Sequence, residues 1–415
     1  MQNQLILSIA AMSALGMGSL SGARGDSCAP GQPAPCYSED CGCTYCYGPE
    51  NTAGNPAVRP RTCNGDFVIE VAGFYWNAHQ DGMEYAVENH VQNPGPEPTA
   101  PPLELNNLIN AEYKTPDFDW DFGFKAGIGY NSACDGWDLG ILWTWYKGKA
   151  SDQVQAEGDD NRTLLPLWSA YAPQQGTPLY ATDIETQWNL ELNMIDLTLG
   201  REFWNSKRLT LRPHIGLRIA RINQSYEIEH KGGSWSANTN AGNPDVQVAY
   251  NDFVDLDNNF KGVGIRAGLD STWNFGCGWG LYGNFAASIV YGRFSLDHDE
   301  TLRLVETPFS KCKILETKES FRASRAMLDL GLGLQWSTLF CGCQYGFTFQ
   351  LGWENHMFFN QNQLWRVARS EVDFVPAGMG FLDLDNPNNT GENIFYQRRG
   401  DLDTQGWTLR IKFEF

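Results

Sequence analysis

Ionisable side chains recur at alternate positions in several segments of this chain. They are the candidate functional residues, because their spacing places them on one face of a strand. One such segment runs from Asp117 to Lys125, and another runs from Arg212 to Arg218. Residues spaced by two in a strand share one face, and charges on a dry face would be very costly. We predict that this face lines a hydrated interior in which its charges select solutes. The alternative is that the charges pair across neighbouring strands and fill a narrow interior. The candidate lining residues are Asp117, Asp119, Asp121, Lys125, Glu185, Glu191, Arg212, His214, Arg218, Arg266, Arg410 and Lys412.

The histidines and acidic clusters give little support for catalysis or metal binding. Of the histidines, His214 alone lies in the middle of a predicted strand, and no serine or cysteine nucleophile motif accompanies it. The run Asp297–Glu300 has the residue types of a metal site, but it lies in a predicted long connection, where a solvated acidic loop is the simpler interpretation. We therefore predict no catalytic residue, no metal site and no cofactor.

The cysteines are numerous and unevenly placed. The chain has 11 of them, and many precede the first predicted strand. In an exported protein this usage favours disulfides over metal ligands, although the spacing of Cys41, Cys43 and Cys46 could imitate a zinc site. An odd number requires at least one free thiol or intermolecular bond. The candidate disulfide residues are Cys28, Cys36, Cys41, Cys43, Cys46, Cys63, Cys134, Cys277, Cys341 and Cys343, and Cys312 is placed in a long outer loop.

The first part of the chain has the features of an exported protein. Residues Leu5–Leu20 are apolar and rich in small residues, and Ser21–Ala23 offers the small side chains of a cleavage site. No Lys or Arg precedes this stretch, which departs from the usual signal. We predict a signal peptide at 1–23, a periplasmic segment rich in Cys, Pro and Gly at 24–65, and a barrel domain at 66–415.

The elements that must position the charged face are predicted strands with two different faces. From Phe118 to Tyr130, apolar residues alternate with Asp, Lys and Gly, which is the period-two pattern of a strand between two unlike surroundings. In the strand that begins at Ile184, the apolar positions change from even to odd after Met194, and we interpret this as a β-bulge. The predicted strands are Phe67–Asn77, Phe118–Tyr130, Trp137–Trp145, Ile184–Leu199, Leu209–Ile222, Phe260–Asn274, Trp279–Phe294, Phe321–Trp336, Tyr345–Trp353 and Trp407–Phe415.

Long and short connections alternate strictly between these strands. The stretch Ala78–Asp117 is long, Asn131–Gly136 is short, and Ala150–Asp183 is long; the order continues to the last connection, Glu354–Gln405. Outer-membrane barrels show this asymmetry, with short periplasmic turns and longer extracellular loops. We predict an all-β fold: an antiparallel transmembrane β-barrel of about 10–12 strands, with room for more.

Composition fits a barrel and excludes some partners. Of the 415 residues 13% are aromatic, the formal net charge is −19, and the mean hydropathy is −0.39. A polar average with many aromatic residues suits a barrel, because only every second residue meets lipid. The acidic excess argues against nucleic acid as a partner. Aromatic belts at the membrane interfaces are predicted from the apolar-face residues Trp120, Trp137, Trp143, Trp188 and Trp407.

Several of these segments resemble one family of outer-membrane proteins. They are Phe67–Ala86, Trp120–Tyr146, Trp188–Ile222, Phe260–Leu269 and Trp279–Phe294, with the terminal Phe415. Over most of the sequence from Asp66 onward, the chain resembles the major outer-membrane porins of chlamydiae and their Legionella-type relatives. The resemblance implies a pore for small hydrophilic solutes, high abundance in the envelope, and a disulfide-crosslinked outer membrane.

The expected function follows from the barrel and from this resemblance. We expect an outer-membrane porin that allows passive diffusion of small hydrophilic solutes and ions and contributes to disulfide-linked envelope structure. Its expected partners are outer-membrane lipid, further copies of itself and disulfide-linked envelope proteins. Two alternatives stay open: a structural envelope protein in which conduction is incidental, and a surface adhesin or receptor that acts through its long loops.

Overall fold

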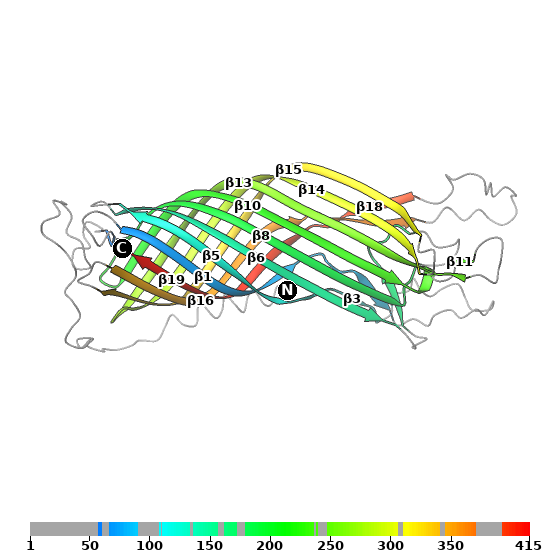
Figure 1. The fold of residues 1–415 in the computed structure, drawn as a ribbon, viewed down its shortest axis with the longest axis horizontal. Coiled ribbons are helices and arrows are strands. Elements are labelled where there is room, and N and C mark those ends of the chain that lie inside the picture. Colours follow the sequence, from blue (N-terminus) through cyan, green and yellow to red (C-terminus); the bar gives the residue numbers. More distant parts are fainter. Residues whose placement is uncertain are drawn as a thin grey trace, which may run out of the picture.

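The chain folds as a closed antiparallel β-barrel in a computed structural model, which describes residues 57–59, 66–89, 108, 110–132, 136–156, 162–171, 179–235, 238–239, 247–305, 310–340, 345–370 and 392–415. Ten long strands form the wall, and β1 pairs with β19 (Figure 1). They are β1 (Asp66–Gln80), β5 (Trp120–Asn131), β6 (Trp137–Gln155), β8 (Asp183–Arg201), β10 (Leu209–Lys231), β13 (Tyr250–Gly276), β14 (Trp279–Leu304), β15 (Lys311–Phe340), β16 (Tyr345–Asn362) and β19 (Gly400–Glu414). The predicted all-β barrel is confirmed, and each predicted strand corresponds to one of these ten.

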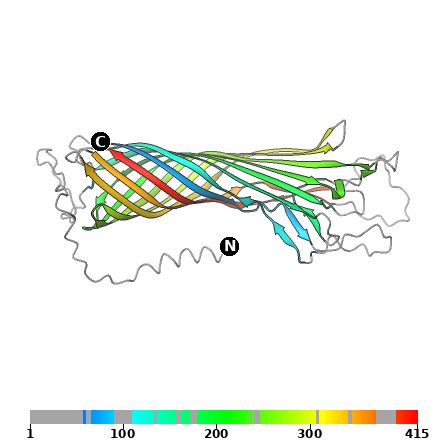
Figure 2. The same ribbon diagram turned by 60° about the horizontal axis from the view of Figure 1, so that its bottom comes forward.

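The strands differ in length, so the wall is much taller on one side. β1, β5, β16 and β19 have 12 to 18 residues, whereas β13, β14 and β15 have 26 to 30. We call the end with the short connections the turn end and the other the loop end. At the loop end the long strands continue beyond the closed barrel as a curved sheet (Figures 1 and 2). We call this sheet the extension; it comprises residues 183–194, 221–231, 250–261, 293–304 and 311–326.

Smaller elements lie outside the ten strands of the wall. A three-stranded sheet of β3 (Glu112–Lys114), β2 (Ala86–Asn89) and β7 (Thr163–Pro166) packs against the extension, and β17 (Trp365–Ser370) pairs with β18 (Glu392–Gln397) as a hairpin. The remaining short elements are β4 (Asp117–Phe118), β9 (Phe203–Trp204), β11 (Asn238–Thr239), β12 (Gln247–Val248) and the 3-10 turn η3 (Gly233–Trp235). No helix among the described residues is long and apolar enough to cross a membrane.

The outer surface of the turn-end half is apolar, and its border towards the loop end is sharp. One cross-strand row of outward side chains is exposed and apolar: Trp143, Ile195, Ile219, Val263 and Tyr291. Two residues further towards the loop end, the matching row is Trp145, Asn193, Arg221, Lys261 and Arg293. Apolar side chains that face outward belong in lipid and charged ones in water. The border between the two rows therefore marks one edge of the membrane.

The inward face is apolar towards the loop end and polar towards the turn end, which is the reverse of the outer face. β8 shows this most clearly. Its even-numbered residues face inward along the whole strand, and the pairing of β8 with β6 and β10 runs without a register shift. The predicted β-bulge after Met194 is therefore wrong. Up to Met194 the inward residues are mostly apolar and fill the core, whereas beyond it the outward residues Ile195 to Leu199 meet lipid. Trp188, predicted for the aromatic belt, is for the same reason fully buried inside; Trp120, Trp137, Trp143 and Trp407 are exposed on the outer surface.

An apolar layer fills the interior of the barrel at its loop-end half. Phe74 and Trp76 of β1 pack in one cluster with Phe260, Phe294 and side chains from β6, β8, β10, β15 and β16. The cluster continues into the extension, where Tyr85 and Trp168, beside the three-stranded sheet, complete it. Along the barrel axis the interior thus changes from polar at the turn end to apolar at the loop end.

Candidate functional site: the charged interior

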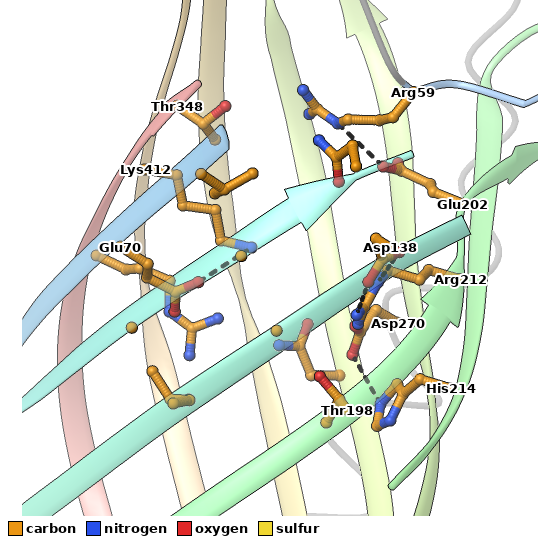
Figure 3. A pocket seen from close by; sticks show the side chains of 18 of the residues that line it. Arg59, Glu70, Asp138, Thr198, Glu202, Arg212, His214, Asp270, Thr348 and Lys412 are labelled. Atoms are coloured by element: carbon orange, nitrogen blue, oxygen red, sulfur yellow. Dashed lines mark hydrogen bonds and ion pairs between the residues drawn. The ribbon is translucent and has the colours of Figure 1, made fainter. Parts of the chain in front are cut away.

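A polar chamber occupies the turn-end half of the barrel. It holds about 1350 Å³ of space, counting the part that is continuous with solvent. Figure 3 shows Arg212 of β10 between Asp138 of β6 and Asp270 of β13. Its guanidinium donates to Asp138 at 2.9 Å through Nε and to Asp270 at 2.7 Å through Nη1. His214 Nε2 lies 3.7 Å from the other oxygen of Asp270.

A short stretch before β1 lies across the turn end of this chamber. The amide of Val58 donates to the carbonyl of Glu202 at 3.1 Å, and Ala57 forms an isolated bridge with Phe203. Arg59 then pairs with Glu202 and with Glu414 of β19, which lies on a distant part of the wall. The side chain of Arg59 lines the chamber (Figure 3). The stretch 57–59 therefore acts as a strap that ties separate strands at the chamber mouth.

An ion-pair layer closes the chamber towards the loop end, and one half of it is centred on Arg218. This side chain of β10 is 1% exposed. It donates to both oxygens of Asp196 on β8 at 2.7 Å and to Asp329 on β15 at 2.7 Å. Arg266 of β13 adds a bond of 3.0 Å to Asp329. Since β10 and β15 are not neighbours in the wall, the pair of Arg218 and Asp329 reaches across the interior.

The other half of the layer is centred on Glu354 of β16. Lys125 of β5 donates to it at 2.6 Å, and Arg410 of β19 donates at 3.2 Å. Arg410 also pairs with Glu70 of β1 at 3.1 Å. His356 joins the halves, with Nδ1 at 2.8 Å from Asp329 and Nε2 at 3.6 Å from Glu354. The layer thus joins five basic groups to four carboxylates, Lys125, Arg218, Arg266, Arg410 and Lys412 against Glu70, Asp196, Asp329 and Glu354.

These contacts support the second interpretation of the charged face, in which the charges pair and fill a narrow interior. The charges pair not only along neighbouring strands but across the interior, and the Nζ of Lys125 lies 4.9 Å from the centre of the Trp76 ring in the apolar layer. The structure therefore has no continuous wide lumen along its described length. Ten strands enclose an interior that side chains can largely fill, whereas barrels of 16 to 18 strands leave a wide aqueous channel, so the described interior is narrower than the open lumen that we expected.

The predicted lining residues fall into two groups. Lys125, Arg212, His214, Arg218, Arg266, Arg410 and Lys412 point into the interior. Glu185 and Glu191 instead lie on the outer side of the extension, where the polar face of β8 meets water. Asp117 and Asp119 are exposed at the loop end. Asp121 of β5 is half-buried and accepts a bond from the Lys149 amide at 3.0 Å.

The acidic partners on three strands were not among the residues predicted from the sequence. Asp196, Asp329 and Glu354 hold most of the basic groups. Asp196 and Glu354 are the only acids on the inward faces of β8 and β16, and the nearest acid to Asp329 on its face of β15 is ten residues away, so no acidic run marks these positions. The available signal was position: each lies on the face opposite the lipid-facing side chains of its strand.

The cysteines are described only in part. Cys277, in the turn between β13 and β14, is disulfide-bonded. Cys28, Cys36, Cys41, Cys43, Cys46, Cys63, Cys134, Cys341 and Cys343 lie outside the described residues. Cys312 is an exposed free cysteine at the loop end of β15 rather than in a loop.

A second group of ionisable residues lies in the core of the extension. Glu300 accepts bonds from the Ser169 hydroxyl at 2.7 Å and from the Ala170 amide at 2.7 Å. Asp252 lies 3.1 Å from Nδ1 of His230, and both are fully buried. Burial raises the pKa of Asp252 to about 7, and burial together with the neighbouring Asp252 raises the pKa of Glu300 to about 8. Burial lowers the pKa of His230 to about 4.

The direction of these shifts fixes how pH affects the extension. Asp252 and Glu300 hold a proton more tightly in the folded state than in the unfolded chain. Their contribution to stability is therefore full below about pH 4 and is lost as the pH rises through about 7 and 8. His230 acts in the opposite sense, because its stabilising contribution is lost as the pH falls from about 6.5 to about 4.

The acidic run Asp297–Glu300 does not gather its side chains. It lies on β14, where Asp297 and Asp299 face outward and His298 and Glu300 face inward. Among the described residues, no group of three or more His, Cys, Asp or Glu side chains is arranged to hold a metal ion.

Comparison with known families identifies the chain. A family model described as the Legionella pneumophila major outer membrane protein precursor matches residues 60–415. The chain belongs to this family. The resemblance to Legionella-type members is confirmed, and this major outer membrane protein is located in the outer membrane. No curated protein matches it.

Solved structures resemble the barrel of this major outer membrane protein only distantly. The outer-membrane protease OmpT of Escherichia coli is 11% identical, with 85% of this chain and 97% of that chain covered and a TM-score of 0.34. A FadL homologue of Pseudomonas aeruginosa is 8% identical, with 88% and 94% covered and a TM-score of 0.21. The toluene transporter TodX of P. putida is 8% identical, with 88% and 92% covered and a TM-score of 0.20. Likenesses this weak carry no inference about function.

Proposed function

We propose that this protein is a narrow outer-membrane pore for ions and small hydrophilic solutes, with the turn end in the periplasm. The observation that carries the proposal is the charged interior, in which nine of the ten strands place an ionisable side chain between the chamber mouth and the apolar layer. Charged groups in such number are stable inside a barrel only where water or opposite charges meet them. The chamber supplies water, and the ion-pair layer supplies opposite charges.

The conformation described here corresponds to a closed pore. The apolar layer around Phe260 and Phe294, whose rings lie 4.7 Å apart, follows directly on the ion-pair layer. Passage therefore requires side chains of the apolar layer to move, and conduction should be low and intermittent. Because the numbers of basic and acidic groups in the layer are nearly equal, the pore should discriminate weakly between cations and anions.

Unitary conductance in planar bilayers tests this proposal. Wild-type protein should give small steps, and Phe260→Ala, which opens space in the apolar layer, should give larger ones. Phe285→Ala is the matched control, because Phe285 is exposed on the lipid side of β14 and its loss should leave the steps unchanged. If folded wild-type and Phe260→Ala proteins both conduct no more than bare lipid, the pore proposal is wrong.

A structural role in the envelope is the second candidate. The strap at residues 57–59 and the disulfide at Cys277 both lie at the turn end. They favour a function in which the turn end is fastened to the N-terminal segment, to another copy or to other envelope proteins. Electrophoresis of thiol-blocked envelopes without reductant should then show crosslinked species that reductant removes, and monomer alone would limit the disulfides to internal ones.

A hydrolytic function is not favoured. The described residues closest to such a set are Ser169, His230, Asp252 and Glu300, and each is at most 3% exposed. No substrate reaches them without unfolding the core of the extension. We therefore propose a protein that acts by permeation and attachment, without a catalytic site.

A further inference from the structure

A second cavity lies in the side of the extension, remote from the charged interior. Its walls are Leu256 and Leu296 of β13 and β14 on one side and Leu364, Trp365 and Phe395 of the β17–β18 region on the other. It holds about 640 Å³, counting the part open to solvent, and its walls are largely apolar. The side of the extension is open at this place because β15 pairs with β16 only from Met327 onward. The part of β15 before Met327 therefore has no β16 neighbour.

One polar side chain is buried in this apolar cavity. His298 of β14 lies between Leu256 of β13 and Thr317 of β15 in the strand register and is 4% exposed. Neither Nδ1 nor Nε2 has a hydrogen-bond partner among the described residues. A buried imidazole without partners costs about 1 to 3 kcal/mol. Burial lowers its pKa to about 4, so at neutral pH the ring has one donor and one acceptor.

The rim of the cavity disfavours charged ligands. Glu319 accepts a hydrogen bond from the Trp365 indole at 2.7 Å, and Lys318 lies 3.7 Å from Asp297. The single rim lysine is thus opposed by two carboxylates, which repel an anion. A cation would have to leave water for apolar walls and a neutral imidazole, which is costly.

We propose that this cavity binds a small neutral apolar molecule that carries one hydroxyl group, of the size of an alkylphenol. The hydroxyl both donates to and accepts from hydrogen-bonding groups, and either ring nitrogen of His298 can serve as its partner. The hydrocarbon part replaces water against the leucines, Trp365 and Phe395. The site is independent of the proposed pore, because the cavity and the chamber share no lining residue.

Binding of 4-propylphenol to the detergent-solubilised full chain tests this inference. Its dissociation constant, from ligand-observed NMR, should be about tenfold lower than that of propylbenzene, since one net hydrogen bond contributes about this factor. In His298→Leu, the preference for 4-propylphenol should be lost or reversed, because the hydroxyl then leaves water without gaining a partner. In His79→Leu, whose ring lies outside the cavity, the tenfold preference should persist.

Two further measurements secure the test. Phe395→Asp replaces an exposed rim residue, so it should fold normally and weaken both ligands at least tenfold. The preference should be constant from pH 6 to 8 because the ring stays neutral. The inference is overturned if binding does not saturate, if 4-propylphenol and propylbenzene bind wild-type protein equally, or if His298→Leu retains the preference. Conductance enters none of these readouts, so failure of the pore proposal would not affect the result.

Discussion

Replacing Arg218 by leucine should remove about 4 kcal/mol from the unfolding free energy of the barrel. The guanidinium is 1% exposed and makes contacts of 2.7 Å with both Asp196 and Asp329. Removing one partner of a buried ion pair costs about 3 to 5 kcal/mol, because the remaining charge stays buried without compensation. Asp329 keeps Arg266 at 3.0 Å and His356 at 2.8 Å, whereas Asp196 keeps only the distant Arg266 at 3.7 Å.

This asymmetry predicts which second substitution restores stability. Adding Asp196→Asn to Arg218→Leu removes the least compensated charge and should recover about 2 kcal/mol, half of the loss. The control is Arg221→Leu, because Arg221 lies on the same strand with its side chain exposed on the outer face. Its effect should stay within about 0.5 kcal/mol. Reversible urea unfolding in lipid vesicles, followed by tryptophan fluorescence, measures all three. A loss no larger than that of the control, or no recovery in the double variant, would refute this assignment of the charges.

Three further predictions concern the extension, the exposed thiol and the last residue. Between pH 6.5 and 8 the extension should lose about 2 kcal/mol of stability as Asp252 and Glu300 ionise in the folded state; hydrogen exchange should show this, and Glu300→Gln should flatten the profile. Cys312 is exposed and free at the loop end, so a membrane-impermeant maleimide should label it on intact cells; absence of labelling would reverse the proposed orientation. Phe415, which exchanges backbone hydrogen bonds of 2.7 and 2.9 Å with Phe67 and lies on the lipid side, should be needed for insertion; normal membrane levels of Phe415→Asp would contradict this.

The wall of the barrel could be predicted from the sequence because its lipid-facing half obeys one simple rule. From Trp407 to Phe415 every second residue is apolar and meets lipid, and the strand ends where the pattern ends. The rule failed on β8, because the apolar face of Ile184–Met194 faces the core whereas that of Ile195–Leu199 faces lipid. Period two cannot tell these surroundings apart, since both favour the same side chains.

The charged site was less accessible to sequence reasoning. The basic residues Arg212, Arg218 and Arg266 could be assigned to the interior from alternation alone. The pairing of Arg218 and Arg266 with Asp329 depends on which strands face each other across the closed ring, and no local pattern encodes that distance. Cross-barrel pairs require strand order, register and barrel size together.

The inversion of the two faces along the strands has a consequence for register. In an ordinary sheet a slip of one residue exchanges the faces, but a slip of two residues preserves them. Here a slip of two along β10 in one direction would bring Arg218 to the level of Ala220 in the apolar layer, and a slip of two in the other direction would move Arg221 into the lipid-facing row now held by Ile219. Both displacements bury a charge, one in protein and one in lipid. Slips by an even number and by an odd number of residues are therefore both unfavourable. Only one pairing of the strand places its apolar residues in lipid or core and its charged residues in water or in ion pairs.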